Sequence, residues 1–228
     1  MNKRLIVLVS FCALFIQGIA QTDKEMDSFI SKLMSQMTLD EKIGQLNLPV
    51  SNSFIAGEQK KGELNPMEQR IVKGEIGGLF GMKGAKQARA IQQIAVDKSR
   101  LHIPLLFGLD VIHGYETTFP IPLALSTSWN VDLIEREAQT AASEASSDGI
   151  CWVFSPMVDI CRDARWGRIA EGSGEDSYLG GEFAKALVRG YQGKDNDLNQ
   201  AGRVMACVKH YALYGGAEAG RDYNTVDM

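Results

Sequence analysis

Charged side chains directly follow apolar segments at three places in this sequence. Asp110 ends one such segment, Arg168 lies in a loop after another, and Lys209-His210 follow a third. One carboxylate, one guanidinium, one ammonium and one imidazole together can both accept and donate hydrogen bonds. Sugar hydroxyls need both kinds of partner, and a charged partner roughly doubles the strength of a hydrogen bond. The set therefore favours a site for a polyol or sugar.

Each of these residues also has an ordinary structural explanation. A single Asp after a strand is often only the N-cap of the next helix. Arg165 and Arg168 around Trp166 could form a salt-bridged corner, or they could present donors and an aromatic edge to a polyol. Lys209 and His210 are harder to explain in this way, because charged groups behind an apolar strand are costly to bury without partners.

Other kinds of site find little support. His102, His113 and His210 show no metal-ligand spacing, and no metal or cofactor is predicted. The glycine-bearing segments 77–84 and 172–177 match neither the P-loop nor the dinucleotide-binding spacing. The chain has 24 Lys and Arg against 28 Asp and Glu, a net charge of −4, which argues against nucleic acid as a partner.

Helix and strand patterns alternate along the chain. The helices are predicted from apolar residues spaced at i, i+3, i+4 and i+7. Their starts are predicted from the capping residues Thr38, Asn65, Asn130 and Asp176. Gly74 and Gly149 are expected to end two of them, and the last is expected to end near Gly190. The predicted helices cover 26–37, 38–43, 66–73, 84–100, 130–148 and 176–190, and the predicted strands lie at 46–50, 76–80, 103–109, within 150–160 and at 203–208. Residues 51–64 are expected to form an exposed loop.

This alternation predicts an α/β fold with a parallel sheet. The sheet could be open and doubly wound, or it could close into a (β/α)8 TIM-type barrel. An open sheet usually carries a Gly-rich phosphate loop after its first strand, and none is present, so the barrel is preferred. In such a barrel the carboxyl ends of the strands line one pocket, which would bring Asp110, Arg168, Lys209 and His210 together.

The first 20 residues are typical of a secretory signal peptide. Lys3 and Arg4 precede the apolar run 5–16, and small residues at 18 and 20 suggest cleavage after Ala20. The run is shorter than the roughly 20 residues of a membrane span. We expect two parts, a signal peptide at 1–20 and a barrel domain at 21–228, in a periplasmic or secreted protein without membrane attachment after cleavage. Free cysteines are often buried, so the remaining thiols are expected to be small core residues at Cys151, Cys161 and Cys207.

Blocks of sequence in a fixed order resemble glycoside hydrolase family 3 over about residues 25 to 228. One block is Leu109-Asp110-Val111-Ile112-His113-Gly114. The full set lies at 37–46, 109–114, 156–159, 162–168, 171–176, 208–211 and 223–228. The resemblance implies a (β/α)8-type barrel whose pocket binds a terminal non-reducing β-D-glucosyl residue.

By motif match, the resemblance implies that Asp110, Arg168, Lys209 and His210 hydrogen-bond the hydroxyls of that glucose. Arg165 and Glu175 are expected to brace the loop. The implied reaction is retaining hydrolysis of a β-glucoside or oligosaccharide, with two carboxyl groups about 5 to 5.5 Å apart. No cofactor is implied, and the oligomeric state is left open.

The resemblance places neither catalytic carboxylate in this chain. The family's nucleophile follows a later apolar strand, whereas Asp222 follows Arg221 in a polar stretch and is rejected. We therefore expect an N-terminal part with about five of the eight strand–helix units, inactive alone, with the nucleophile Asp and the acid/base Glu beyond residue 228. The alternatives are a non-catalytic carbohydrate-binding protein and a β-xylosidase of the same family. The loop from 209 to 216 lacks the proline and second histidine of the β-N-acetylhexosaminidase branch, so that branch is disfavoured.

Overall fold

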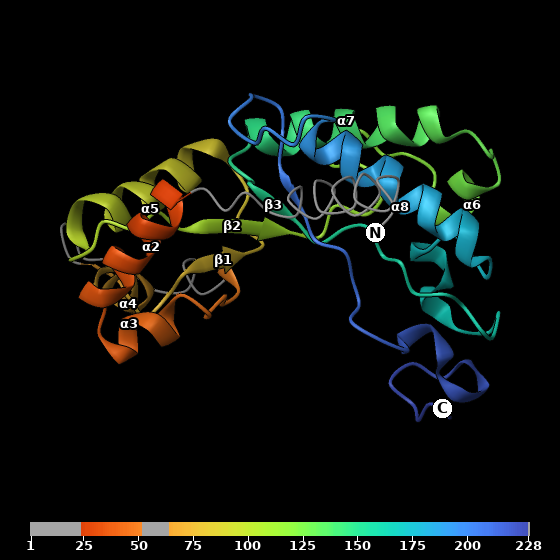
Figure 1. Cartoon of the computed structure of the whole chain (residues 1–228), viewed down its shortest axis with the longest axis horizontal. Helices are drawn as coiled ribbons and strands as arrows, with labels where there is room; N and C mark the ends of the chain where they lie inside the picture. The colour runs from red at the N-terminus through yellow and green to blue at the C-terminus, as the bar shows by residue number, and fades with distance from the viewer. Residues whose placement is uncertain (1–23, 52–63, 228) are drawn as a thin grey trace, which may run out of the picture. The chain divides into compact units, whose positions relative to one another are not determined.

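The computed structural model describes residues 24–51 and 64–227 (Figure 1). The predicted signal peptide and nearly all of the predicted loop at 51–64 lie outside these ranges. The chain divides into two compact units, Met1–Lys42 and Ile43–Met228. No helix in the described ranges is long and apolar enough to cross a membrane.

The first unit contains helix α2 (Lys24–Gln36) and most of α3 (Leu39–Gly44). The capping box predicted at the start of α3 is confirmed. The backbone N–H of Thr38 donates to the Glu41 carboxylate at 2.8 Å, and the Glu41 N–H donates to the Thr38 hydroxyl at 3.2 Å. These reciprocal bonds satisfy two backbone donors that the helix itself cannot pair.

The second unit is built on a parallel sheet, as predicted. Its strands β1 (Gly78–Phe80), β2 (Leu106–Leu109), β3 (Trp152–Val153) and β4 (Met205–Ala206) lie side by side in chain order. Every described pairing between them is parallel. The order contains no reversal, which a doubly wound sheet would have. Each strand therefore ends at the same edge as its neighbours.

The predicted strand at 46–50 is only a single parallel bridge, in which Val50 pairs with Phe80. The other strands are shorter than predicted, and proline gives one reason. Pro104 and Pro156 lack the backbone N–H that a sheet ladder requires. Accordingly β2 begins after Pro104, and β3 ends before Pro156.

Helices pack against the sheet around two apolar cores of this unit, and Figure 1 shows how these helices are arranged. Helices α4 (Pro66–Val72) and α5 (Ala85–Lys98) pack with β1 and β2 around Ile71, Leu79 and Phe107. Helices α7 (Val131–Ser147) and α8 (Ser177–Gln192) lie side by side over the second core, together with the short α6 (Pro122–Ser126). The predicted N-caps of α4, α7 and α8 are confirmed, at Asn65, Asn130 and Asp176.

A third, smaller cluster contains Met157, Cys161 and Trp166. Cys161 is buried there, as predicted, whereas Cys151 and Cys207 are only half-buried. The three thiols are free among the described residues. Burial raises the pKa of the Cys151 and Cys161 thiols above the usual range, so both favour the unreactive protonated form.

The sequence predicts that helix α8 ends near Gly190, and in the structure it ends two residues later. The helix continues to Gln192, and Gly193, with a φ of 80°, follows it. Gly190 instead allows α7 and α8 to approach closely. A Cβ at this position would lie 2.4 Å from the Ala138 Cβ and 2.5 Å from the Glu135 carbonyl oxygen.

We expect Gly190→Ala to destabilise the protein by roughly 1–3 kcal/mol, because the helices must separate to admit the methyl group. Gly181 lies in the same helix with open space where a Cβ would stand, so Gly181→Ala is the matched control. That control should be neutral or stabilise by up to about 1 kcal/mol. Urea unfolding of both variants measures the difference, and equal effects would contradict the close approach.

The N-terminus of α5 is capped by the residue that follows helix α7. Gly84 offers no capping side chain, and the Asp148 carboxylate accepts the backbone N–H groups of Gly84 at 2.9 Å and Ala85 at 3.0 Å. The hydroxyl of Tyr115 also donates to Asp148. These bonds, led by that of Tyr115, hold the pKa of the Asp148 carboxyl below its usual range.

A carboxyl whose pKa is lower in the folded chain contributes stability above its unfolded value of about 3.9, and the contribution is lost as the pH falls. We expect Asp148→Ala to cost about 1–2 kcal/mol at neutral pH and less near pH 3. Asp97→Ala removes an exposed carboxylate near the end of α5 and is the control. Thermal unfolding at both pH values checks the prediction, which fails if the two variants show the same pH dependence.

Candidate functional site

The chain segments after β3 and β4 continue the sheet and place the candidate residues. Met157 and Lys209 form a parallel bridge beyond the strands. The Lys209 N–H donates to the Pro156 carbonyl at 3.0 Å, and the Val158 N–H donates to the Lys209 carbonyl at 2.7 Å. The peptide bonds Ser155–Pro156 and Lys209–His210 are both cis. Backbone pairing thus fixes the position from which Lys209 and His210 project.

Asp110 and Lys209 form an ion pair at this edge of the sheet. Asp110 directly follows β2, and its Oδ1 lies 2.7 Å from the Lys209 Nζ. The pair joins the ends of β2 and β4, which are separated by β3. The Lys209 side chain is only 14% exposed, and the half-exposed Asp110 carboxylate compensates its charge. This contact to Lys209 gives Asp110 a role other than the helix N-cap considered from the sequence.

His210 is held by a second carboxylate. One oxygen of Asp159 accepts the backbone N–H of His210 at 3.0 Å and lies 2.8 Å from the ring Nδ1. The ring also packs edge-to-face with the ring of Tyr214, with centroids 4.7 Å apart. The imidazole is therefore positioned from two sides.

Arg168 lies in the 3-10 helix η2 (Gly167–Glu171) and forms a two-pronged ion pair with Glu171. Its Nε and Nη2 lie 2.7 and 2.8 Å from the two Glu171 oxygens, and its Nη1 donates to the Tyr214 hydroxyl at 3.2 Å. Arg168 is the main cause that lowers the pKa of Glu171, with smaller contributions from Lys209 and His210. Burial is the main cause that raises the pKa of Tyr214 to about 12. Glu171 thus stays anionic among three basic side chains.

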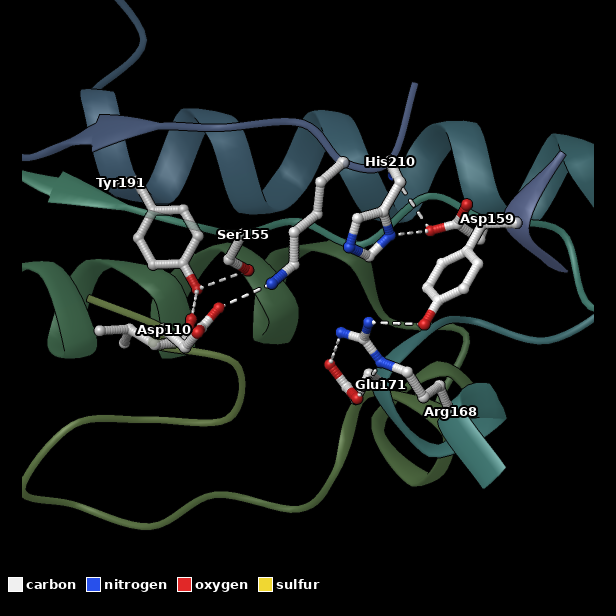
Figure 2. A network of polar contacts seen from close by, with 10 residues as sticks. Asp110, Ser155, Asp159, Arg168, Glu171, Tyr191 and His210 are labelled. Carbon is white, nitrogen blue, oxygen red and sulfur yellow. Dashed lines mark hydrogen bonds and ion pairs between the residues drawn. The ribbon is translucent and has the colours of Figure 1, made fainter. Parts of the chain in front are cut away.

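The four predicted residues come together in one polar network, in which Lys209 is placed by its ion pair with Asp110 and the other three are labelled in Figure 2. Figure 2 shows Asp110, Glu171 and His210 pointing toward a common region from three separate chain segments. The network contains accepting carboxylates and donating ammonium and guanidinium groups within a small area. Such a mixture can satisfy neighbouring hydroxyl groups of a sugar, each of which donates and accepts.

Other residues of the basic loop have structural roles. Trp166 is 1% exposed, and its indole N–H donates to Asp222 at 2.9 Å, so the idea that this ring offers an edge to a polyol is wrong. Arg165 pairs with Asp163 on the surface and lowers the pKa of that carboxyl to about 2. The corner interpretation thus holds for Arg165, while Arg168 belongs to the network.

Sequence reasoning assigned no role to Asp159, Glu171 or Tyr214. Two of them carry a recognisable signal: Asp159 follows a strand, and Glu171 stands three residues after Arg168. A fourth residue, Tyr191 of α8, lies buried behind the site. Its hydroxyl lies 3.1 Å from the carbonyl of Val111, next to Asp110, and 3.2 Å from the Ser155 hydroxyl. It therefore ties α8 to the segment that carries Asp110.

In residues 24–51 and 64–227, no group of three or more His, Cys, Asp or Glu side chains is arranged to hold a metal ion. The residues of the network are instead paired with one another as acid and base. These pairs can offer hydrogen bonds and charge to a ligand.

Comparison with known proteins gives consistent matches. The sequence profile of the glycosyl hydrolase family 3 N-terminal domain matches residues 38–228. The chain is 42% identical over 210 residues to a periplasmic β-glucosidase of Salmonella typhimurium, and 29% identical over 228 residues to a β-xylosidase of Formosa agariphila. These alignments cover 91% and 98% of this chain.

Solved structures of a β-glucosidase from Listeria innocua match the fold. Its complex with isofagomine aligns with a TM-score of 0.78 at 44% identity, and its complex with glucose with 0.76 at 42%. Both alignments cover 88% of this chain but only 28% and 29% of the Listeria chain. The same holds for the sequence relatives, of which 26% and 27% are covered. The chain thus spans little more than a quarter of the length of these relatives.

Proposed function

Because this chain belongs to glycosyl hydrolase family 3, we propose that it supplies the glucose-binding half of a β-glucosidase pocket. The substrate is a β-glucoside or oligosaccharide with a terminal non-reducing glucosyl residue. Asp110, Arg168, Lys209 and His210 bind the hydroxyls of that residue. The observation that carries the proposal is that these four side chains, from the segments that follow β2, β3 and β4, come together beyond the carboxyl ends of these parallel strands.

The proposal includes a retaining mechanism completed by residues outside this sequence. A carboxylate attacks the anomeric carbon and a second carboxyl group protonates the leaving oxygen, at a separation of about 5 to 5.5 Å. The carboxylates of the network are engaged by Lys209, His210 and Arg168, which suits binding better than nucleophilic attack. The strand order supports the N-terminal part of a (β/α)8 barrel, since successive parallel neighbours are the order of such a barrel.

We further propose that the protein is exported to the periplasm or secreted. The signal-peptide pattern at 1–20 supports this, as does the periplasmic name of the Salmonella relative. The domain at 21–228 would then act on sugars outside the cytoplasm. A non-catalytic sugar-binding protein uses the same site and differs only in lacking turnover.

Calorimetric titration of the 228-residue chain with glucose, xylose and galactose tests the binding proposal. We expect binding of glucose in preference to the other two sugars. Equal or stronger binding of xylose would favour the β-xylosidase function, towards which the 29% identical Formosa relative points. Failure to bind any of the three would overturn the proposed site.

Hydrolysis of an aryl β-glucoside tests the mechanistic part. The 228-residue chain should bind without turnover, whereas the longer protein that contains it should release the phenol. Turnover by the 228-residue chain would contradict the proposal that both catalytic carboxylates lie elsewhere. Absence of turnover in the longer protein would favour a non-catalytic sugar-binding function.

A further inference from the structure

Asp159 is a buried carboxylate beside the candidate site. Its side chain is only 3% exposed, and it follows the Met157–Lys209 bridge by two residues. Burial of a carboxylate without hydrogen-bond partners is costly, so the contacts of Asp159 are expected to be needed for its burial. Both described partners of its Oδ2 belong to His210, which lies 51 residues further along the chain.

The geometry of this contact fixes the backbone and the ring of His210 together. The same oxygen accepts the backbone N–H at 3.0 Å and lies 2.8 Å from Nδ1. Rotation of the ring about its Cα–Cβ bond would break the second contact and leave the first. The edge contact with Tyr214 opposes such a rotation from another side. The imidazole therefore has one preferred orientation before any sugar arrives.

The contact also selects where the ring carries its proton. A carboxylate accepts hydrogen bonds and donates none. A close contact with Nδ1 is therefore favourable only when Nδ1 bears hydrogen. In the neutral ring this leaves Nε2 without hydrogen, as an acceptor for a sugar hydroxyl. Nε2 lies on the other side of the ring from Asp159 (Figure 2).

We propose that Asp159 is a positioning residue, which orients His210 and holds its proton on Nδ1 so that Nε2 faces the sugar. The second half of this inference rests on the proposed function, because it assumes that His210 binds a sugar. The first half concerns the ring alone. The two halves are tested by separate measurements.

Nitrogen-15 NMR of the imidazole rings in the 228-residue chain tests the first half. In such spectra a ring nitrogen that bears hydrogen is distinguished from one that does not, so they identify the tautomer directly. His210→Gln assigns the resonances by the signals that it removes. We expect a single tautomer with hydrogen on Nδ1. A ring with hydrogen on Nε2 in the unaltered chain would overturn the proposal, and this result needs no Asp159 variant to fold.

Two substitutions of Asp159 show whether the His210 tautomer depends on a hydrogen-bond acceptor at this position or only on packing. Asp159→Asn retains an oxygen that can accept both N–H groups, so we expect the Nδ1–H tautomer to persist. Asp159→Leu has no acceptor, and we expect a mixture of tautomers. Asp163→Leu removes a nearby surface carboxylate that pairs with Arg165, and it should leave the ring unchanged. An unchanged tautomer in a folded Asp159→Leu would overturn the proposal.

Glucose titration of the same variants tests the second half. We expect the Kd of Asp159→Leu to rise about tenfold, as for loss of one well-placed hydrogen bond, and that of Asp159→Asn to rise by less than about threefold. A changed tautomer with an unchanged Kd would overturn the claim that Nε2 faces the sugar. If the unaltered chain binds no glucose, the proposed function and this second half fail together, while the NMR result still decides whether Asp159 positions the ring.

Discussion

Lys209→Met is expected to raise the Kd for glucose by about 10- to 150-fold. In the proposed site Lys209 donates to a sugar hydroxyl, so the substitution would remove one charge-assisted hydrogen bond, which contributes about 1.5–3 kcal/mol. It also leaves Asp110 without the ammonium group that now lies 2.7 Å from its Oδ1. Methionine preserves most of the apolar length of lysine, so the packing of this side chain changes little. Calorimetric titration of the 228-residue chain measures the effect.

The matched control is Lys185→Met. Lys185 also pairs with a carboxylate, Glu182, at 2.6 Å, but its side chain is 62% exposed on α8. Surface ion pairs of this kind contribute about 0–1 kcal/mol to stability, and this one is not part of the network. We therefore expect unchanged glucose binding. Equal binding by the two lysine variants would show that Lys209 does not contact the sugar.

A double-mutant cycle that combines Lys209→Met with Asp110→Asn shows whether Lys209 and Asp110 bind the sugar as a unit. If the carboxylate holds the ammonium group in place, the loss in the double variant is smaller than the sum of the two single losses. The expected coupling energy is about 0.5–3 kcal/mol, the range found for residues in contact. Strict additivity would mean that each residue meets the sugar independently.

Local patterns in the sequence predicted the helices well and the strand boundaries poorly. Helix starts depend on side chains three residues apart, so Asn130 and Asp176 could be recognised as caps without the rest of the fold. Strand ends depend on which backbone groups find partners in a distant segment. The role of Gly190 could not be predicted from local patterns either, because its closest neighbours lie on α7, more than fifty positions earlier in the chain.

The sequence could predict which site residues lie close together, because parallel strands end at one edge of the sheet. Asp110, Lys209 and His210 follow strands, so their proximity follows from the α/β topology. The partners that orient them were not predictable in this way. Tyr214 reaches Arg168 across 46 positions of the chain, and Asp159 reaches His210 across 51. Periodicity and capping carry no information about contacts of this length.

The loop that bears Arg168 depends on one buried side chain. Trp166 packs its ring edge-on to Tyr214 at 5.2 Å between centroids, and its indole N–H donates to Asp222. It thereby joins the loop to the 3-10 helix η3 (Tyr214–Gly216) and the segment after it. We expect Trp166→Ala to lower the free energy of unfolding by about 3–5 kcal/mol, as for other buried tryptophans. Urea unfolding measures this loss.

Two further variants identify what Trp166 contributes. Trp166→Phe retains much of the ring but loses the N–H donor to Asp222, so we expect a loss of about 1–2 kcal/mol. Trp129→Ala removes a tryptophan that is 74% exposed and should change stability by less than about 0.5 kcal/mol. Because Arg168 stands two residues beyond Trp166, glucose binding should weaken in the same order as stability. If Trp166→Ala behaved like Trp129→Ala in both measurements, the loop would be held in place by its other contacts and not by the Trp166 ring.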